Sequence, residues 1–176
     1  MIRAPRKARP DDCHGVARLA NSVSKARLIE EGAGPEEIQA SGFILYPLKA
    51  EHAAEPNYRD RILAAPHFYV VEDDDEIIAF MMAYPFHVMR RLQWKTTNDL
   101  EVLEYFTQRC GCDERCIYVQ QAVSSRRHRH LRPRPMEGIV KMLVEERGEA
   151  PAAITEIALA PEPNLASASF TQHKAG

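Results

Sequence analysis

The sequence is poor in the features that mark membrane, exported or bulk nucleic-acid-binding proteins. No apolar run approaches the ~20 residues that a bilayer-spanning helix needs. The basic N-terminal segment has no apolar stretch of the kind that a signal peptide carries, so we expect a cytoplasmic protein with reduced thiols. Lys and Arg number 23 against 25 Asp and Glu, a net charge of −2, so coating of DNA by overall charge is excluded.

The sequence also lacks the spacings of the common metal centres. Its seven histidines form no H-x-x-x-H or H-E-x-x-H pattern, and three of the four cysteines fall at 110, 112 and 116. That C-x-C with a third cysteine is an incomplete zinc set, because zinc sites use C-x2–4-C pairs and four ligands. We therefore expect no metal, and we interpret the cysteine segment as a turn that enters a strand.

What is present fits one α/β domain over 1–176, a length sufficient to bury a core. The pattern predicts an extended stretch at 2–8 and then one helix, which starts at 9–12 and buries Val16, Leu19, Ala20 and Val23. Short helices are predicted at 36–41 and 58–64. Strands at 68–72 and 77–84, joined by the acidic turn 73–76, predict an antiparallel hairpin.

The second half alternates helices and strands. A helix is predicted from Asn98, with Leu100, Leu103 and Phe106 as its apolar side, followed by a strand at 117–123. Met136, Ile139, Val140, Leu143 and Val144 recur with the clearest helical period in the chain. A strand at 154–159 and a final helix at 165–174 complete the order, which predicts a mixed sheet flanked by helices.

This order resembles the GNAT superfamily of acyl-CoA-dependent N-acetyltransferases. The segments that carry the resemblance are the junction at 9–12, the hairpin at 68–80, the strand at 118–123 and the stretch at 157–167, which leads into a helix through Asn164. The resemblance spans nearly the whole chain. It implies a mostly antiparallel sheet whose fourth and fifth strands splay apart, and it implies acetyl transfer from acetyl-CoA to a primary amine.

The resemblance also implies where acetyl-CoA would bind. Backbone groups of Gln121, Ala122 and Val123 would pair with the pantetheine arm, and the loop after this strand would hold the pyrophosphate at a helix N-terminus. On the family's spacing, that loop comprises His128, Arg129, His130, Leu131 and Arg132. Asn164 is either a helix cap or a hydrogen-bond partner of the pantetheine arm.

The loop departs from the family's Q/R-x-x-G-x-G/A pattern. Leu131 and Pro133 take the glycine positions, and Pro133 has no N–H to offer a phosphate. A second register, with Gly138 as the first glycine, places Glu137 beside the phosphates and is electrostatically poor. The five arginines at 126–134 either replace the amide contacts to the phosphates with charge or form a solvated loop. A competing explanation of the missing glycines is a local sequence error, in which the reading frame of GC-rich codons is shifted by one base. Nucleic acid is unlikely as the partner because no aromatic residue is present for base stacking.

The C-terminal part departs too. In the family, more strands follow the last helix, so we expect this domain to lack them, and an exposed sheet edge would favour a homodimer. Thr171 stands near the family's usual general-acid tyrosine, which leaves the catalytic residues unknown. The sequence therefore indicates an N-acetyltransferase acting on a small-molecule or peptide amine. The alternative is a GNAT-like module that binds acyl-CoA or a partner without turnover.

These departures predict weak, salt-sensitive binding of acetyl-CoA. Each lost charge-assisted hydrogen bond contributes ~1.5–3 kcal/mol, so two lost donors weaken binding by roughly 10²–10⁴-fold. Exposed arginine pairs recover only ~0.2–1 kcal/mol each. Calorimetry should show tighter binding when Leu131→Gly and Pro133→Gly are combined. Tight binding by the unaltered chain at high salt would place the phosphates elsewhere.

Overall fold

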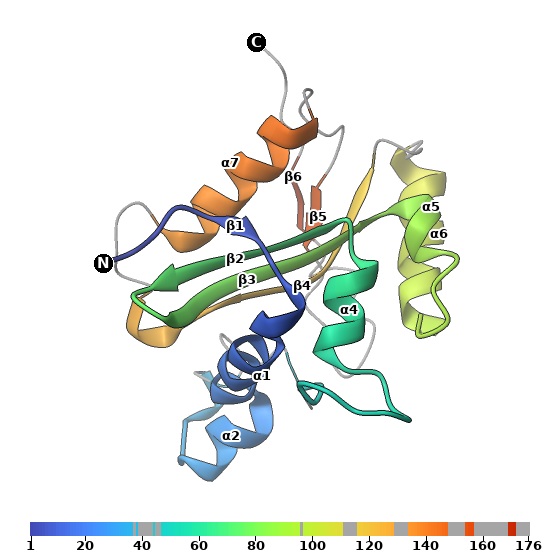
Figure 1. The fold of residues 1–176 in the computed structure, drawn as a ribbon. Coiled ribbons are helices and arrows are strands. Elements are labelled where there is room, and N and C mark those ends of the chain that lie inside the picture. The colour runs from blue at the N-terminus through green and yellow to red at the C-terminus, as the bar shows by residue number, and fades with distance from the viewer. Residues whose placement is uncertain are drawn as a thin grey trace.

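The computed structural model describes residues 1–36, 38, 44, 47–95, 97–110, 116–128, 134–147, 154–156 and 169–171. They form a six-stranded sheet with the strands in sequence order (Figure 1). The strands are β1 (Arg6–Lys7), β2 (His67–Asp73), β3 (Glu76–Pro85), β4 (Ile117–Ser124), β5 (Ile154–Glu156) and β6 (Ser169–Thr171). The helices are η1 (Pro10–Asp12), α1 (Cys13–Ser22), α2 (Lys25–Glu30), α4 (Tyr58–Ala64), α5 (Phe86–Met89), α6 (Thr97–Cys110), η2 (Arg126–His128) and α7 (Pro135–Arg147).

The sheet lies between two helical layers. Helix α7 covers one face and α1 and α4 cover the other, with α2 beyond α1, while α5 and α6 lie beside the end of the sheet where β3 finishes (Figure 1). Strands β1 to β4 pair antiparallel, and β4 pairs parallel with β5. Helix α7 makes the crossover that a parallel pair requires. The expected fold class, a mixed and mostly antiparallel sheet flanked by helices, is confirmed.

The central hairpin follows the prediction closely. Aromatic and β-branched residues fill β2 and β3, and nine of the ten residues of β3 are buried because helices cover both of its faces. Asp74 in the turn has a φ of 53°, a left-handed conformation that aspartate tolerates better than most residues. The hairpin is therefore the buried centre of the sheet, and β4 pairs with its second strand.

A charge cluster joins β1, η1 and β2 at the start of α1. The Arg6 guanidinium donates to both carboxylate oxygens of Asp12, at 2.7 and 2.8 Å, and to Glu72. The Arg9 backbone N–H also donates to Asp12, at 2.6 Å. Burial raises the pKa of Asp12, but these donors outweigh it and hold that pKa below its ordinary value. The predicted helix start is confirmed, and this cluster fixes it to the sheet.

Two sequence predictions are wrong. Leu100 is 39% exposed, whereas Asp99 is 2% exposed, so α6 turns Asp99, Val102, Leu103 and Phe106 inward. The polar partner that Asp99 finds on the sheet accounts for this rotation. The predicted final helix is interrupted, since Ser169–Thr171 form β6, antiparallel to β5. Thr171 pairs with Ile154 there, so it does not stand in a helix.

Asp12→Asn should make the protein less sensitive to acid. A carboxylate whose pKa is depressed on folding contributes stability above its unfolded pKa of about 3.9, and this contribution is lost as the pH falls through the folded pKa. Urea unfolding between pH 6 and pH 3 should show a shallower loss for the variant, with lower stability at pH 6. Asp11→Asn, at the exposed neighbour, is the control and should follow the wild-type curve. Equal slopes for the two variants would contradict the assignment.

Candidate functional site

Strand β4 contains an irregularity opposite the end of β3. Met82 pairs with Gln121 and Ala83 pairs with Val119, which leaves Gln120 without an opposite residue. Such a bulge bends the strand and re-aims side chains, and bulges are over-represented beside active sites. The parallel pairing of β4 with β5 is recorded for Ile117–Val119, so the bulge comes one residue after it.

The bulge turns two consecutive glutamines toward the same helix. In a regular strand neighbouring side chains point to opposite faces. Here Tyr58 of α4 donates to Gln121 Oε1 at 3.1 Å, and Arg61 Nη1 donates to Gln120 Oε1 at 3.1 Å. Tyr58 and Arg61 are three residues apart and therefore share one face of α4. The helix thus holds both amide side chains on the α4 side of the sheet.

Arg61 lies in a buried cluster of hydrogen-bond donors. Its side chain is 6% exposed, and its Cζ lies 4.5 Å from the centroid of the Trp94 ring, a cation–π geometry. The Tyr84 hydroxyl, Arg61 Nε and Trp94 Nε1 are buried, and the described residues give them no hydrogen-bond partner of acceptable geometry. Tyr84 is near enough for the Arg61 charge to act on it, but burial dominates and raises the pKa of its hydroxyl.

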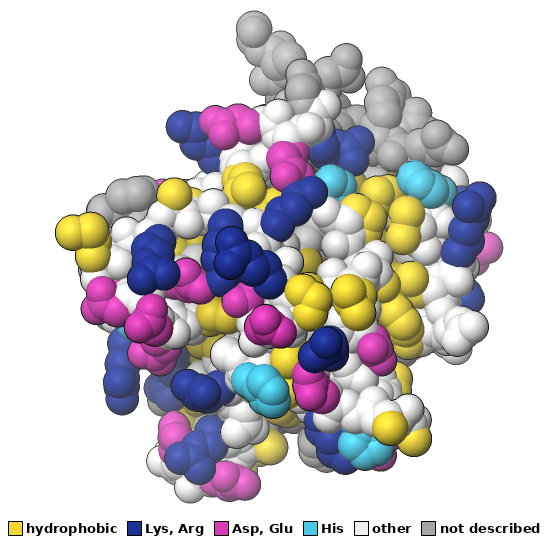
Figure 2. Space-filling view, viewed as in Figure 1, with side chains coloured by type: hydrophobic (Ala, Val, Ile, Leu, Met, Phe, Trp, Pro, Cys, Tyr) yellow, Lys and Arg dark blue, Asp and Glu magenta, His cyan; other side chains and the backbone are white. Residues whose placement is uncertain are grey.

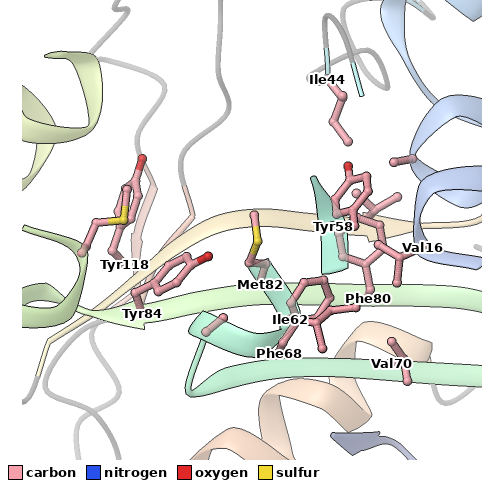
Figure 3. Close-up of a cluster of buried hydrophobic side chains, with 14 of the residues drawn as sticks. Val16, Ile44, Tyr58, Ile62, Phe68, Val70, Phe80, Met82, Tyr84 and Tyr118 are labelled. Carbon is pink, nitrogen blue, oxygen red and sulfur yellow. The ribbon is translucent and has the colours of Figure 1, made fainter. Parts of the chain in front are cut away.

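Tyr118, unlike Tyr84, has a hydrogen-bond acceptor for its hydroxyl. Its hydroxyl donates to Asp99 Oδ1 at 2.5 Å, and both residues are almost fully buried. Burial raises the pKa of Tyr118, and the Asp99 charge raises it further. Figure 3 shows Tyr118, Tyr84 and Met82 on the same face of the sheet as Tyr58. One tyrosine of this face therefore has a strong acceptor, whereas its neighbour has none.

The structure places part of the predicted acetyl-CoA site on β4. Gln121, Ala122 and Val123 pair with Met82, Met81 and Phe80 on the β3 side. On the β5 side, the described residues provide a partner only for Ile117–Val119. The shared start of the two strands is as expected, while their divergence near Leu159 lies outside the described residues. The roles assigned to Gln121, Ala122 and Val123 stay predictions.

The basic loop is described only in its first turn. His128 ends η2, and its Nε2 lies 3.4 Å from Asp73 in the hairpin turn. Arg126 lies 3.7 Å from Glu31. Arg129, His130, Leu131, Arg132 and Asn164 lie outside the described residues, as does Cys112. Two of the side chains that the sequence associates with phosphate binding thus contact carboxylates in this structure.

A pocket of about 720 Å³ lies between α1, the hairpin turn and the end of β4. Its charged lining comprises Asp11, Asp12, Glu31, Glu72, Asp75, Glu76, Arg18, Arg126 and Arg127. Six carboxylates against three guanidinium groups make it a poor place for a pyrophosphate. The face that Figure 2 presents likewise carries basic and acidic side chains intermixed.

One trio of potential metal ligands was not predicted. In the described part of the chain, Cys13, His14 and Glu51 bring their ligand atoms within 4.8 Å of one another. The thiol is a poor ligand, because burial and the Glu51 charge raise the pKa of Cys13 and keep it protonated. Arg59 already holds Glu51 at 2.6 Å.

Within the described residues, no helix is both long and apolar enough to span a bilayer.

Sequence reasoning missed Arg61, Trp94 and the bulge. A signal for Arg61 was present, since Tyr58, Arg61, Ile62 and Ala65 follow the i, i+3, i+4, i+7 spacing of a buried helical stripe. An arginine in such a stripe indicates a specific partner, because buried arginines are rare unless paired. The bulge has no local signature, since it arises from the pairing of β4 with β3.

Comparisons with known proteins give only distant likenesses. No family model matches the chain, and no curated protein matches it. Nine solved chains match in structure. An apo form of a mutant agmatine N-acetyltransferase is 16% identical, with a TM-score of 0.47 over 88% of this chain and 74% of that one. The polyamine N-acetyltransferase of Drosophila melanogaster is 16% identical, with a TM-score of 0.45 over 88% and 75%.

A third match is N-acetylglutamate synthase from Neisseria gonorrhoeae, solved with coenzyme A and N-acetyl-glutamate. It is 12% identical, with a TM-score of 0.41 over 88% of this chain and 24% of that one. At these identities and TM-scores, the likenesses concern the outline of the fold and do not extend to individual residues of the site.

Tyr84→Phe and Tyr118→Phe should have opposite effects on stability. Removing the unpartnered Tyr84 hydroxyl relieves a desolvation cost, so the free energy of unfolding should stay equal or rise by about 1 kcal/mol. Removing the Tyr118 hydroxyl takes a donor from buried Asp99 and should lower that free energy by about 1.5–3 kcal/mol. Urea unfolding of both variants measures the difference. Comparable destabilisation of the two would mean that Tyr84 has an acceptor.

Proposed function

We propose that this protein is an N-acetyltransferase that moves an acetyl group from acetyl-CoA to a primary amine. The observation that carries the proposal is the β4 bulge at Gln120, immediately after the parallel pairing with β5. The bulge directly precedes Gln121 to Val123, the residues along which the GNAT resemblance puts the pantetheine arm. A fold alone does not define an activity, so the argument depends on this local geometry.

The β4 edge supplies binding groups for the acyl donor. From Gln121 to Ser124, the strand pairs with β3 on one side, and the described residues leave its other side without a strand. The backbone N–H and C=O groups on this free side of β4 can pair with the amides of a pantetheine arm. The arm would then lie along β4 as an additional strand would. The bulge turns the backbone of Gln120 out of the ladder, where it faces the thioester end.

The reaction depends on holding the amine and the thioester in the correct relative position. The amine nitrogen attacks the thioester carbon, the C–N bond forms, the C–S bond breaks, the nitrogen gives up a proton and the thiolate takes one. Holding two reactants in an attack geometry supplies much of the rate enhancement. Tyr58 and Arg61 contribute by fixing Gln121 and Gln120, so that the floor of the groove does not rearrange when a substrate enters.

A binding module without turnover is the second candidate. The contact of His128 with Asp73 and that of Arg126 with Glu31 favour it, because both engage side chains that would otherwise be available to the pyrophosphate. Such a module would hold acyl-CoA along β4 but release no thiol. The two candidates therefore differ in turnover and agree on binding.

Thiol release from acetyl-CoA with a panel of primary amines should separate them. We expect amine-dependent release, and Gln120→Ala should lower kcat/KM by about tenfold, since a hydrogen bond to a charged group contributes about 1.4 kcal/mol or more. Gln93→Ala, an exposed glutamine, is the matched control and should be silent. Acetyl-CoA binding with no release for any amine would select the binding module. Neither binding nor release would reject both.

A further inference from the structure

The donor cluster around Arg61 has the composition of an anion-binding site. It combines a guanidinium, an indole N–H and a phenol hydroxyl, and three of their polar atoms form no hydrogen bond of good geometry within the described part of the chain. Arg61 donates to Gln120, a neutral amide, and the Tyr84 oxygen is its other close polar neighbour. The site therefore presents several donors and one charge to whatever occupies it.

The charge of Arg61 is not balanced by a direct ion pair in the described part of the chain. Asp99 acts on it at longer range, while its Oδ1 accepts from the Tyr118 hydroxyl. Burial lowers the pKa of Arg61, but an arginine side chain stays protonated in proteins. An unpaired buried cation is costly, and the Trp94 ring compensates for only part of that cost. An entering anion would supply the missing partner.

The cluster reaches the surface beside the proposed acyl-transfer groove. Tyr58 and Tyr84 are fully buried and form its wall. Trp94, Gln120 and Gln121 are half-buried, so the cluster lies close to the surface on their side. Because Gln120 is also the bulge residue, a molecule bound at Arg61 would extend toward the β4 edge, where the thioester is proposed to lie.

We propose that Arg61, Tyr84 and Trp94 bind the carboxylate of the acceptor, so that the acceptors of this protein are amines that also carry a carboxylate. This inference rests on the proposed function. The planar fork of an arginine matches a carboxylate with two parallel hydrogen bonds, which a lysine cannot reproduce. The indole N–H and the phenol hydroxyl add neutral donors to the same anion.

Pairs of probes that differ only in the carboxylate test the proposal. Ornithine with putrescine, and lysine with cadaverine, keep the same amine and chain. Calorimetry without acetyl-CoA should show that each amino acid binds and that its decarboxylated partner binds about 10–100-fold more weakly, the effect of losing a hydrogen-bonded charge pair. Equal binding within both pairs, or no binding of either amino acid to the folded protein, overturns the proposal.

Arg61→Met supplies the first variant test, with Arg59→Met as its matched control. Both positions lie on α4, but Arg59 is exposed and pairs with Glu51. Arg61→Met should weaken amino-acid binding at least tenfold and leave the decarboxylated amine unchanged, and Arg59→Met should alter neither. Retained amino-acid binding in Arg61→Met contradicts the proposal.

Tyr84→Phe keeps the proposal testable if Arg61→Met fails to fold. It preserves the shape of the core and should weaken amino-acid binding about 2–10-fold, as expected for one neutral hydrogen bond, without loss of stability. A purely structural role for Tyr84 would leave binding unchanged, and that result counts against the site.

The outcomes separate this inference from the proposed function. Carboxylate-dependent binding without thiol release supports the Arg61 site and rejects the transferase. Thiol release that is equal for both members of each pair supports the transferase and rejects the Arg61 site.

Discussion

The register shift between β3 and β4 is the constraint on which the candidate site depends. One extra residue, Gln120, changes which face the following side chains occupy, and two adjacent glutamines come to lie on the α4 side. Without it, Gln120 and Gln121 would alternate across the sheet, and only one of them could reach α4. Helix α4 and strand β4 are therefore coupled through a single irregularity of pairing.

The sequence predicts well the elements that local pattern determines. The hairpin of β2 and β3, helix α4 and helix α7 appear where their periodicity and turn residues indicate, because burial of a one-sided apolar stripe or a strand is a short-range property of the chain. The predicted bounds of α4, residues 58–64, are those of the structure. For these elements, local preference and tertiary packing agree.

The failures occur where a partner distant in sequence decides the outcome. Periodicity assigned Leu100 to the buried side of α6, yet Asp99 takes that place because Tyr118, 19 residues later, offers it a hydrogen bond. Strand β6 replaces part of a predicted helix because Ser169–Thr171 find an edge in β5. Arg61 lies in an apolar stripe for a similar reason, since its ring and amide partners come from Trp94 and Gln120. None of these contacts has a local signature.

The distribution of charge gives the final step of the argument. The sequence directs attention to the arginines after β4, yet in the structure Arg126 faces Glu31, His128 faces Asp73 and the adjacent pocket carries more carboxylates than guanidinium groups. Solvent screens these exposed pairs, so they contribute little to recognition. Arg61 differs from them, since it is buried, bound to a neutral amide and surrounded by donors that lack acceptors. In a low-dielectric site the same unit of charge acts far more strongly on a bound anion than it does at the surface. The residue that most strongly discriminates among acceptors should therefore be the arginine hidden in a hydrophobic stripe, more than the visible cluster of arginines in the loop.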